Sequence, residues 1–257
     1  MAHDDPDHAA LRELVSIWTP HASTSSLVYS TGRSLAKYLE LRAFAPPMPH
    51  PDLLICSVGT EIYRLVPTAD DDRTPILVKE WSEFLSHNWD ADQCRTIAAD
   101  VSSHLVLQEA SEQRPHKVSF HLDTVDQATA QDVVDRLQSA LRAASLDAQV
   151  IYSGGRDVDV LPVRAGKGQA CAWVLDLMEQ GAGRPSVGTL VCGDSGNDRD
   201  LFIVPGVVGV AVRNAHPELR AFVEREIGSG NTNILFATRT CAGGIVEALA
   251  HFKLFEG

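Results

Sequence analysis

The chain has 257 residues, of which 44% are apolar, and a formal net charge of −12 at pH 7. This length gives one large domain or two small ones, and the acidic charge argues against a general nucleic-acid or anionic-membrane binder. No window approaches the roughly 18 apolar residues of a membrane span. The N-terminus lacks the pattern of a signal peptide, so we expect a cytoplasmic, globular protein.

The N-terminal part alternates short apolar runs with helical patterns, which is typical of an α/β fold. Residues 7–19 have apolar positions at helical spacing, and residues 27–30 form a short strand closed by Thr31-Gly32-Arg33. Ser34 is expected to cap a helix over 34–42. A Pro-rich loop over 45–51 then leads to a buried strand over 52–58.

The pattern changes after about residue 78. Residues 117–123 alternate with period two and predict a half-exposed strand, and 128–146 form an amphipathic helix with one apolar face. Strands over 148–152 and 158–161 are joined by Ser-Gly-Gly-Arg, a hairpin-like turn. We therefore predict an α+β module over 80–160, inserted into an α/β core formed by 1–79 and 161–257.

From Lys167 the α/β pattern resumes. The elements expected here are helices over 167–179, 217–226 and 243–253, and strands over 188–192, 207–212 and 233–236. The run GAGRPSVG at 181–188 mimics a phosphate-binding loop, but it lies between a helix and a strand in the wrong order. We interpret it as a helix end and turn.

Three groups of polar residues follow core strands or open a helix, where α/β sheets bind ligands. They are Thr31, Lys167 in Gly-Lys-Gly, and the acids Asp194 and Asp198 of GDSGND. A hydroxyl, an ammonium and two carboxylates suit phosphoryl transfer with Mg²⁺, which prefers oxygen ligands. Taken singly, the same residues could be a helix cap, a solvated lysine and surface acids.

Several longer runs together resemble the sucrose-phosphate phosphatase family of the haloacid dehalogenase superfamily. The runs are YSTGRS (29–34), SVGTEIY (57–63), EQRPHKVSF (112–120), IYSGGRDVDVLP (151–162), GKGQA (166–170), CGDSGND (192–198) and CAGGIVEALAHF (241–252). The resemblance implies a Rossmann-like core with a parallel sheet and a cap that selects the sugar. It also implies a catalytic hydroxyl at Thr31, a catalytic lysine at Lys167, a direct Mg²⁺ ligand at Asp194, and outer-shell roles for Asn197 and Asp198.

The family's substrate, sucrose 6-phosphate, is clamped between cap and core. The candidate substrate contacts are the polar residues of the family-specific runs, together with the two residues that follow Thr31: Gly32, Arg33, Glu61, Lys117, Arg156, Asp157 and Asp159. In the alternative interpretation, Lys117 and the two acids Asp157 and Asp159 only occupy the solvent face of the cap strands.

The family's nucleophile is an aspartate in a D-x-D-x-T run at the end of the first core strand, and this sequence has no such run there. Asp5-Pro6-Asp7 has the spacing but neither the preceding strand nor the threonine. The resemblance places the missing strand between strands 27–30 and 188–192, so two inner sheet edges should be left open. We expect a chain that starts too late, through a missing exon or a misassigned start, with a pseudoenzyme as the alternative.

Two further functions remain open. The chain could be a non-catalytic module that docks on sucrose-phosphate synthase, or a phosphatase for another glycosyl phosphate, such as a mannosylglycerate or glucosylglycerol phosphate. Plant family members carry a further C-terminal domain, and we expect a single-module form because this chain ends just after its last core helix.

Overall fold

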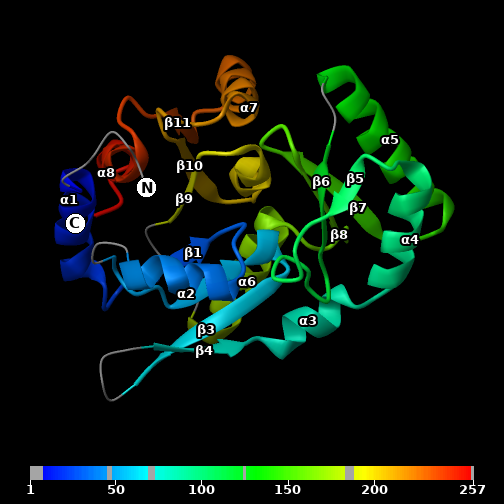
Figure 1. Ribbon diagram of the computed structural model, residues 1–257. Helices are drawn as coiled ribbons and strands as arrows, with labels where there is room; N and C mark the ends of the chain where they lie inside the picture. The colour runs from blue at the N-terminus through cyan, green and yellow to red at the C-terminus, as the bar shows by residue number, and fades with distance from the viewer. Residues whose placement is uncertain (1–7, 45–47, 69–72, 124–125, 183–187, 256–257) are drawn as a thin grey trace. The chain divides into compact units, whose positions relative to one another are not determined.

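The computed structural model describes residues 8–44, 48–68, 73–123, 126–182 and 188–255 (Figure 1). The chain forms two compact units. The first unit contains Met1–Tyr29, Leu39–Leu53 and Lys167–Gly257, and the second contains Ser30–Tyr38 and Leu54–Gly166. The predicted division into a core over 1–79 and 161–257 and a cap over 80–160 stays a prediction.

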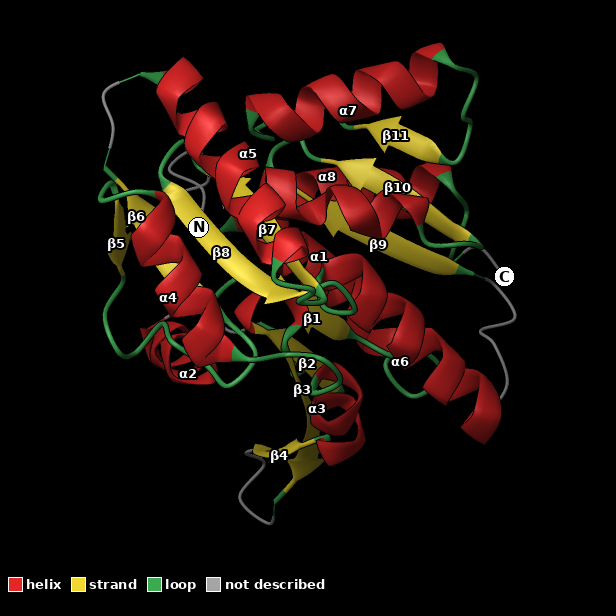
Figure 2. Ribbon diagram, turned by 90° about the vertical axis from the view of Figure 1, so that its right-hand side faces the viewer, coloured by secondary structure: helices red, strands yellow, loops and turns green. Residues whose placement is uncertain are grey.

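The first unit is built on a parallel sheet of β9 (Thr189–Gly193), β10 (Val207–Ala211) and β11 (Ile234–Phe236), in the order β11-β10-β9 (Figure 2). Its helices are α1 (Ala9–Trp18), α6 (Lys167–Ala182), α7 (Pro217–Gly228) and α8 (Cys241–His251), with 3₁₀ turns η1 (Thr19–His21) and η3 (Gly196–Ile203). The parallel core sheet expected from the sequence is confirmed. The run GAGRPSVG lies largely outside the described residues.

Both faces of this sheet are covered, as expected for parallel strands that are apolar throughout. Val191 of β9 packs with Phe202 of η3 and Phe222 of α7 on one face. Its neighbours Leu190 and Cys192 pack with Ala248 of α8 on the other face. The alternation of side chains along a strand therefore places η3 and α7 on one side of the sheet and α8 on the other.

The second unit holds an antiparallel sheet in the order β5-β6-β8-β7, from β5 (Leu105–Leu107), β6 (Val118–Leu122), β7 (Ala148–Ser153) and β8 (Asp157–Pro162). Helices α4 (Ala91–Val101) and α5 (Gln127–Ala143) lie together on one face (Figure 1). Asp90 and Asp126 cap them by accepting backbone N–H bonds. The α+β character predicted for this part of the chain, its hairpin and the apolar face of α5 are confirmed.

The prediction of a half-exposed strand over 117–123 is wrong. Lys117 is 3% exposed and Ser119 is 0% exposed, whereas His121 is partly exposed and Asp123 is exposed. The polar positions alternate as predicted, but Lys117 and Ser119 face other polar side chains and not water. The alternation therefore predicted the strand correctly, but it did not predict that other polar side chains lie against its polar face.

A third sheet has the order β1-β2-β3-β4, and its last two strands were not predicted. The elements around it are β1 (Val28–Ser30), α2 (Leu35–Phe44), β2 (Leu53–Cys56), the 3₁₀ turn η2 (Ser57–Gly59), β3 (Glu61–Pro67), β4 (Arg73–Leu77) and α3 (Lys79–Leu85). Among the described residues, β1 and β9 are each the last strand of their own sheet. No other strand among the residues that the structure describes pairs with the outer side of either one.

In the part of the chain that the structure describes, no helix has the length and apolar character of a membrane span.

Candidate active site

The acidic turn after β9 is organised around Asp198, which is 4% exposed. Its Oδ1 accepts a hydrogen bond of 2.6 Å from Lys167 Nζ. Its Oδ2 accepts bonds of 3.0 Å from the backbone N–H groups of Asp194 and Ser195, and a longer bond from the Ser195 hydroxyl. The ammonium and the three donors of the turn neutralise this buried carboxylate.

Asp194 differs from Asp198, because its side chain is exposed. Its backbone is fixed, since its N–H donates to Asp198 and its carbonyl accepts a bond of 2.7 Å from His216 N. No hydrogen bond or ion pair reaches its carboxylate from the residues that the structure describes. Asn197 lies on the same turn, and its Oδ1 accepts a bond of 2.8 Å from Ser195 Oγ.

This donor set fits Mg²⁺ through a single carboxylate. Within the described residues, no group of three or more His, Cys, Asp or Glu side chains could hold a metal. Mg²⁺ usually keeps several waters and uses one or two carboxylates together with substrate phosphate oxygens, so Asp194 fits that role. Asp198 already accepts from Lys167 and the turn, which agrees with the outer-shell role implied by the resemblance.

The loop Thr31–Arg33 belongs to the second unit. The Thr31 hydroxyl accepts a bond of 3.1 Å from Arg33 N, which leaves its own proton free to be donated to a ligand. Arg33 is exposed, and the Ser34 hydroxyl caps α2 by accepting from Lys37 N at 3.4 Å. The predicted cap at Ser34 is therefore confirmed, and Thr31 keeps the hydrogen that its predicted role requires.

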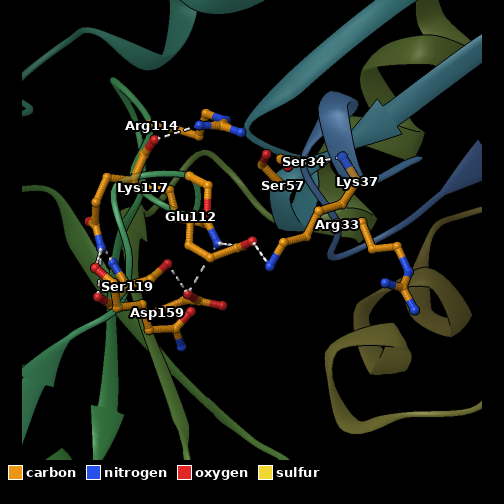
Figure 3. Close-up of polar contacts among 12 residues, drawn as sticks. Arg33, Ser34, Lys37, Ser57, Glu112, Arg114, Lys117, Ser119 and Asp159 are labelled. Atoms are coloured by element: carbon orange, nitrogen blue, oxygen red, sulfur yellow. Dashed lines mark hydrogen bonds and ion pairs between the residues drawn. The ribbon is translucent and has the colours of Figure 1, made fainter. Parts of the chain in front are cut away.

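A largely buried polar cluster surrounds Lys117 in the same unit, and we call it the Lys117 cluster (Figure 3). Its members are Lys37, Glu112, Lys117, Ser119 and Asp159. Glu112 lies between the ammonium groups of Lys37 and Lys117, at 2.5 and 3.5 Å. Asp159 accepts from Ser119 Oγ at 2.6 Å and lies 3.5 Å from Lys117 Nζ. The cluster thus concentrates paired donors and acceptors.

Sequence reasoning identified Lys117 and Asp159 but missed the other three members. Lys117 and Asp159 are 3% and 7% exposed, so the solvent-face alternative is wrong for both. A signal for Ser119 was available, since it shares one face of β6 with Lys117. Glu112 opens the family-specific run EQRPHKVSF, whereas nothing in the local sequence marks Lys37 as its partner.

The remaining predicted substrate residues lie outside the Lys117 cluster. Asp157 is half-exposed and bonds His121 Nδ1 at 3.0 Å and Gln108 Nε2 at 3.2 Å. Arg156 is exposed. Glu61 lies elsewhere, where it accepts from Ser57 Oγ at 3.1 Å and pairs with Arg114 at 3.5 Å. Their contacts with a substrate stay predictions.

Residues 70–74, DDDRT, also match D-x-D-x-T, in a place that the sequence reasoning did not consider. Residues 69–72 lie outside the described part of the chain, as do Asp5 and Asp7. Arg73 and Thr74 open β4, which pairs antiparallel with β3. The run therefore connects two antiparallel strands, whereas the expected nucleophile follows a parallel core strand.

The five cysteines are free; Cys56 and Cys94 are buried, and the other three are partly buried. Burial raises the pKa of the Cys56 and Cys94 thiols to about 12. Burial, with the charge of Asp198, does the same for Cys192. These three thiols stay protonated at neutral pH and are poor nucleophiles.

Glu112 should make the stability of the protein depend on acid pH. Burial alone would raise the pKa of this carboxyl, but the hydrogen bond from Lys37 and the charge of Lys117 outweigh burial and lower the pKa from 4.5. The lowered pKa stabilises the folded state above pH 4.5, and this contribution is lost as the pH falls through the folded-state pKa. Lys37→Met should therefore cost about 1 kcal/mol at neutral pH and less in acid.

Urea unfolding across this pH range measures the effect of Lys37→Met. Lys79→Met is the control, because Lys79 is an exposed lysine on α3. A cost that stayed constant as the pH fell below 4.5 would contradict the assignment to Glu112.

The fold and the acidic turn together define a class. A haloacid dehalogenase-like hydrolase of Bacillus subtilis shares the fold, with a TM-score of 0.63 at 14% identity over 99% of this chain and 87% of that one. The architecture is therefore that of a haloacid dehalogenase-like α/β protein. A model of the sucrose-6F-phosphate phosphohydrolase family matches residues 1–253, and the chain belongs to this family.

Two relatives carry the comparison further. Sucrose-phosphatase 1 of Nicotiana tabacum is 41% identical over 256 residues, which cover 98% of this chain and 56% of that protein. The chain thus spans just over half the length of the curated relatives that head the comparison. The crystal structure of the Synechocystis sucrose-phosphatase, in complex with sucrose and phosphate, has a TM-score of 0.79 at 36% identity, over 95% of this chain and 91% of that one.

Proposed function

We propose that the chain is the catalytic module of a Mg²⁺-dependent phosphatase that hydrolyses sucrose 6-phosphate to sucrose and phosphate. The observation that carries the proposal is that Asp198 is buried and paired with Lys167, while Asp194 on the same turn is exposed, in a chain that belongs to the sucrose-phosphatase family. The match to a relative solved with sucrose and phosphate supports the choice of substrate.

Each proposed role follows from the chemistry of one side chain. Asp194 would hold Mg²⁺, which when bound neutralises phosphoryl oxygens. Lys167, which is held in place by Asp198, would contribute a positive charge that stabilises the phosphoryl group. The Thr31 hydroxyl would donate a hydrogen bond to the phosphoryl group. The Lys117 cluster would bind sugar hydroxyls, which are matched by neighbouring donors and acceptors. Predicted contacts at Gly32, Arg33, Arg156 and Asp157 belong to the same proposal.

The nucleophile is the part of the reaction that this sequence does not supply in the expected place. The test compares the chain as it is with a version that begins with an added V-S-D-L-D-x-T strand. We expect Mg²⁺-dependent phosphate release from sucrose 6-phosphate by the extended protein only, and its loss when the first added aspartate is changed to asparagine. Phosphate release by neither protein would overturn the proposal.

The other functions are separated by companion measurements. Tight, Mg²⁺-independent binding of the unextended chain to sucrose-phosphate synthase would favour the non-catalytic docking module. Faster hydrolysis of another glycosyl phosphate by the extended protein would favour the third function. The cytoplasmic location expected from the sequence stays a prediction.

A further inference from the structure

Residues Ser57–Gly59 form a left-handed turn in the interior of the second unit. Their φ angles are 52°, 59° and 85°, and the first two belong to non-glycine residues. Val58 is a genuine outlier, because a β-branched side chain rarely adopts positive φ. Ser57 is 0% exposed and Val58 is 3% exposed. A backbone conformation of this kind persists only where the surrounding structure holds it.

Backbone hydrogen bonds connect this turn to the loop Thr31–Arg33. Ser57 N donates to the Arg33 carbonyl at 2.9 Å, and Val58 N donates to the Thr31 carbonyl at 3.2 Å. On the other side, the Trp81 indole donates to the Gly59 carbonyl at 3.1 Å. The two strained residues therefore direct their N–H groups at the backbone of the loop that carries the Thr31 hydroxyl.

Glu61 connects this turn to a second structure. Its Oε2 accepts from Ser57 Oγ at 3.1 Å and lies 3.5 Å from Arg114 Nε. Arg114 and Lys117 exchange two backbone hydrogen bonds, of 3.0 and 3.2 Å. Figure 3 draws Ser57 and Arg114 together with Glu112, Lys117, Ser119 and Asp159. Glu61 thus connects the Ser57–Gly59 turn, which is bonded to the Thr31 loop, with the segment that carries Lys117.

We propose that Glu61 is a positioning residue that couples the loop Thr31–Arg33 to the Lys117 cluster, so that a phosphate at the loop and a sugar at the cluster strengthen each other's binding. The identity of the two ligands rests on the proposed function. The connection itself rests on the contacts of Ser57, Glu61 and Arg114, which all belong to one compact unit.

The physical basis is conformational entropy. When one ligand orders the connected protein segments, the second ligand binds to segments that are already ordered and loses less entropy. A phosphate that orders the Thr31 loop also orders Ser57 and Val58 through their N–H bonds, and Glu61 transmits that order to Arg114 and Lys117. Coupling of this kind is reciprocal and commonly amounts to about 5–150-fold in affinity.

Calorimetry of the unmodified chain with sucrose, with and without saturating inorganic phosphate, measures the coupling. We expect phosphate to tighten sucrose binding by about tenfold in the natural protein and by less than about twofold in Glu61→Gln and Arg114→Met. Glu80→Gln is the matched control, because Glu80 is an exposed glutamate of the same unit, and it should keep the full effect. Equal coupling in all four proteins, or no coupling in the natural one, would overturn the inference.

Amide exchange measured by NMR separates this inference from the proposed function, since it needs no ligand. In Arg114→Met the Ser57 and Val58 amides should exchange about tenfold faster, while the amides of β10 keep their rates. Unchanged rates at Ser57 and Val58 would overturn the positioning role even if both ligands bind. If neither ligand binds, the proposed function fails, and the exchange rates alone decide whether Glu61 links the two structures.

Discussion

Lys167→Met is expected to lower the free energy of unfolding by about 3–5 kcal/mol, which is the usual cost of breaking a buried ion pair by removing one partner. The Lys167 and Asp198 side chains are 6% and 5% exposed, and Nζ lies 2.6 Å from Oδ1. Methionine matches the aliphatic stem of lysine, so packing changes little. The loss comes from leaving the Asp198 carboxylate charged in the interior, with only the donors of its own turn.

Urea unfolding measures this loss, and two further variants show that it belongs to the pair. Asp200→Asn removes an exposed acid two residues from Asp198 and should change stability by less than about 0.5 kcal/mol. The double variant Lys167→Met/Asp198→Asn should be less destabilised than the sum of its single variants, because neither charge is then left without its partner. Strict additivity would show that the two side chains do not interact in solution.

The pairing of Lys167 with Asp198 could not be predicted, although both residues could. Their places before a helix and after a core strand are local features that the sequence displays. Their direct contact depends on how closely the start of α6 approaches η3, and a pattern of residue types does not contain that distance. The sequence predicted an outer-shell role near a metal for Asp198, and the structure adds that its oxygens accept from Lys167 and from the turn.

The missed elements have weak local signals for identifiable reasons. The strand β4 contains Pro75 and follows the acidic run of residues 70–72, so it resembles a loop in sequence. The buried positions of α4 are Cys94 and Ala98, which are too small and too few to produce a clear helical period. In contrast, α5 buries Val133, Leu137 and Leu141, and its face was predicted correctly.

The Lys117 cluster shows the same limit at a site. Lys117 directly precedes β6, which pairs with β8, and Ser119 of β6 is the residue directly opposite Asp159 of β8. That register brings the carboxylate to the hydroxyl and the ammonium, and it was not visible from either strand alone. Lys37 comes from a distant part of the chain, so only the folded structure could assign it to Glu112.

Gly168→Ala is the second large effect that we expect. A Cβ at this position would lie 2.4 Å from the backbone oxygen of Asp200 and 2.6 Å from its Cβ, so the backbone of α6 or η3 must move. Overpacking of this kind typically costs about 1–3 kcal/mol. The position after Lys167 thus requires glycine for a steric reason. Without a Cβ there, the first turn of α6 can approach η3 closely enough for Lys167 Nζ to reach Asp198.

Gly228→Ala is the control, because a Cβ there meets no atom within 4 Å at the end of α7, and it should leave stability unchanged or slightly higher. If Gly168→Ala acts partly by separating Lys167 from Asp198, its cost should be smaller in the Lys167→Met background, where no pair remains to be disturbed. An equal cost in both backgrounds would assign the whole effect to the clash with Asp200. A cost near zero would mean that α6 and η3 can separate freely, and the close approach would then not explain the glycine.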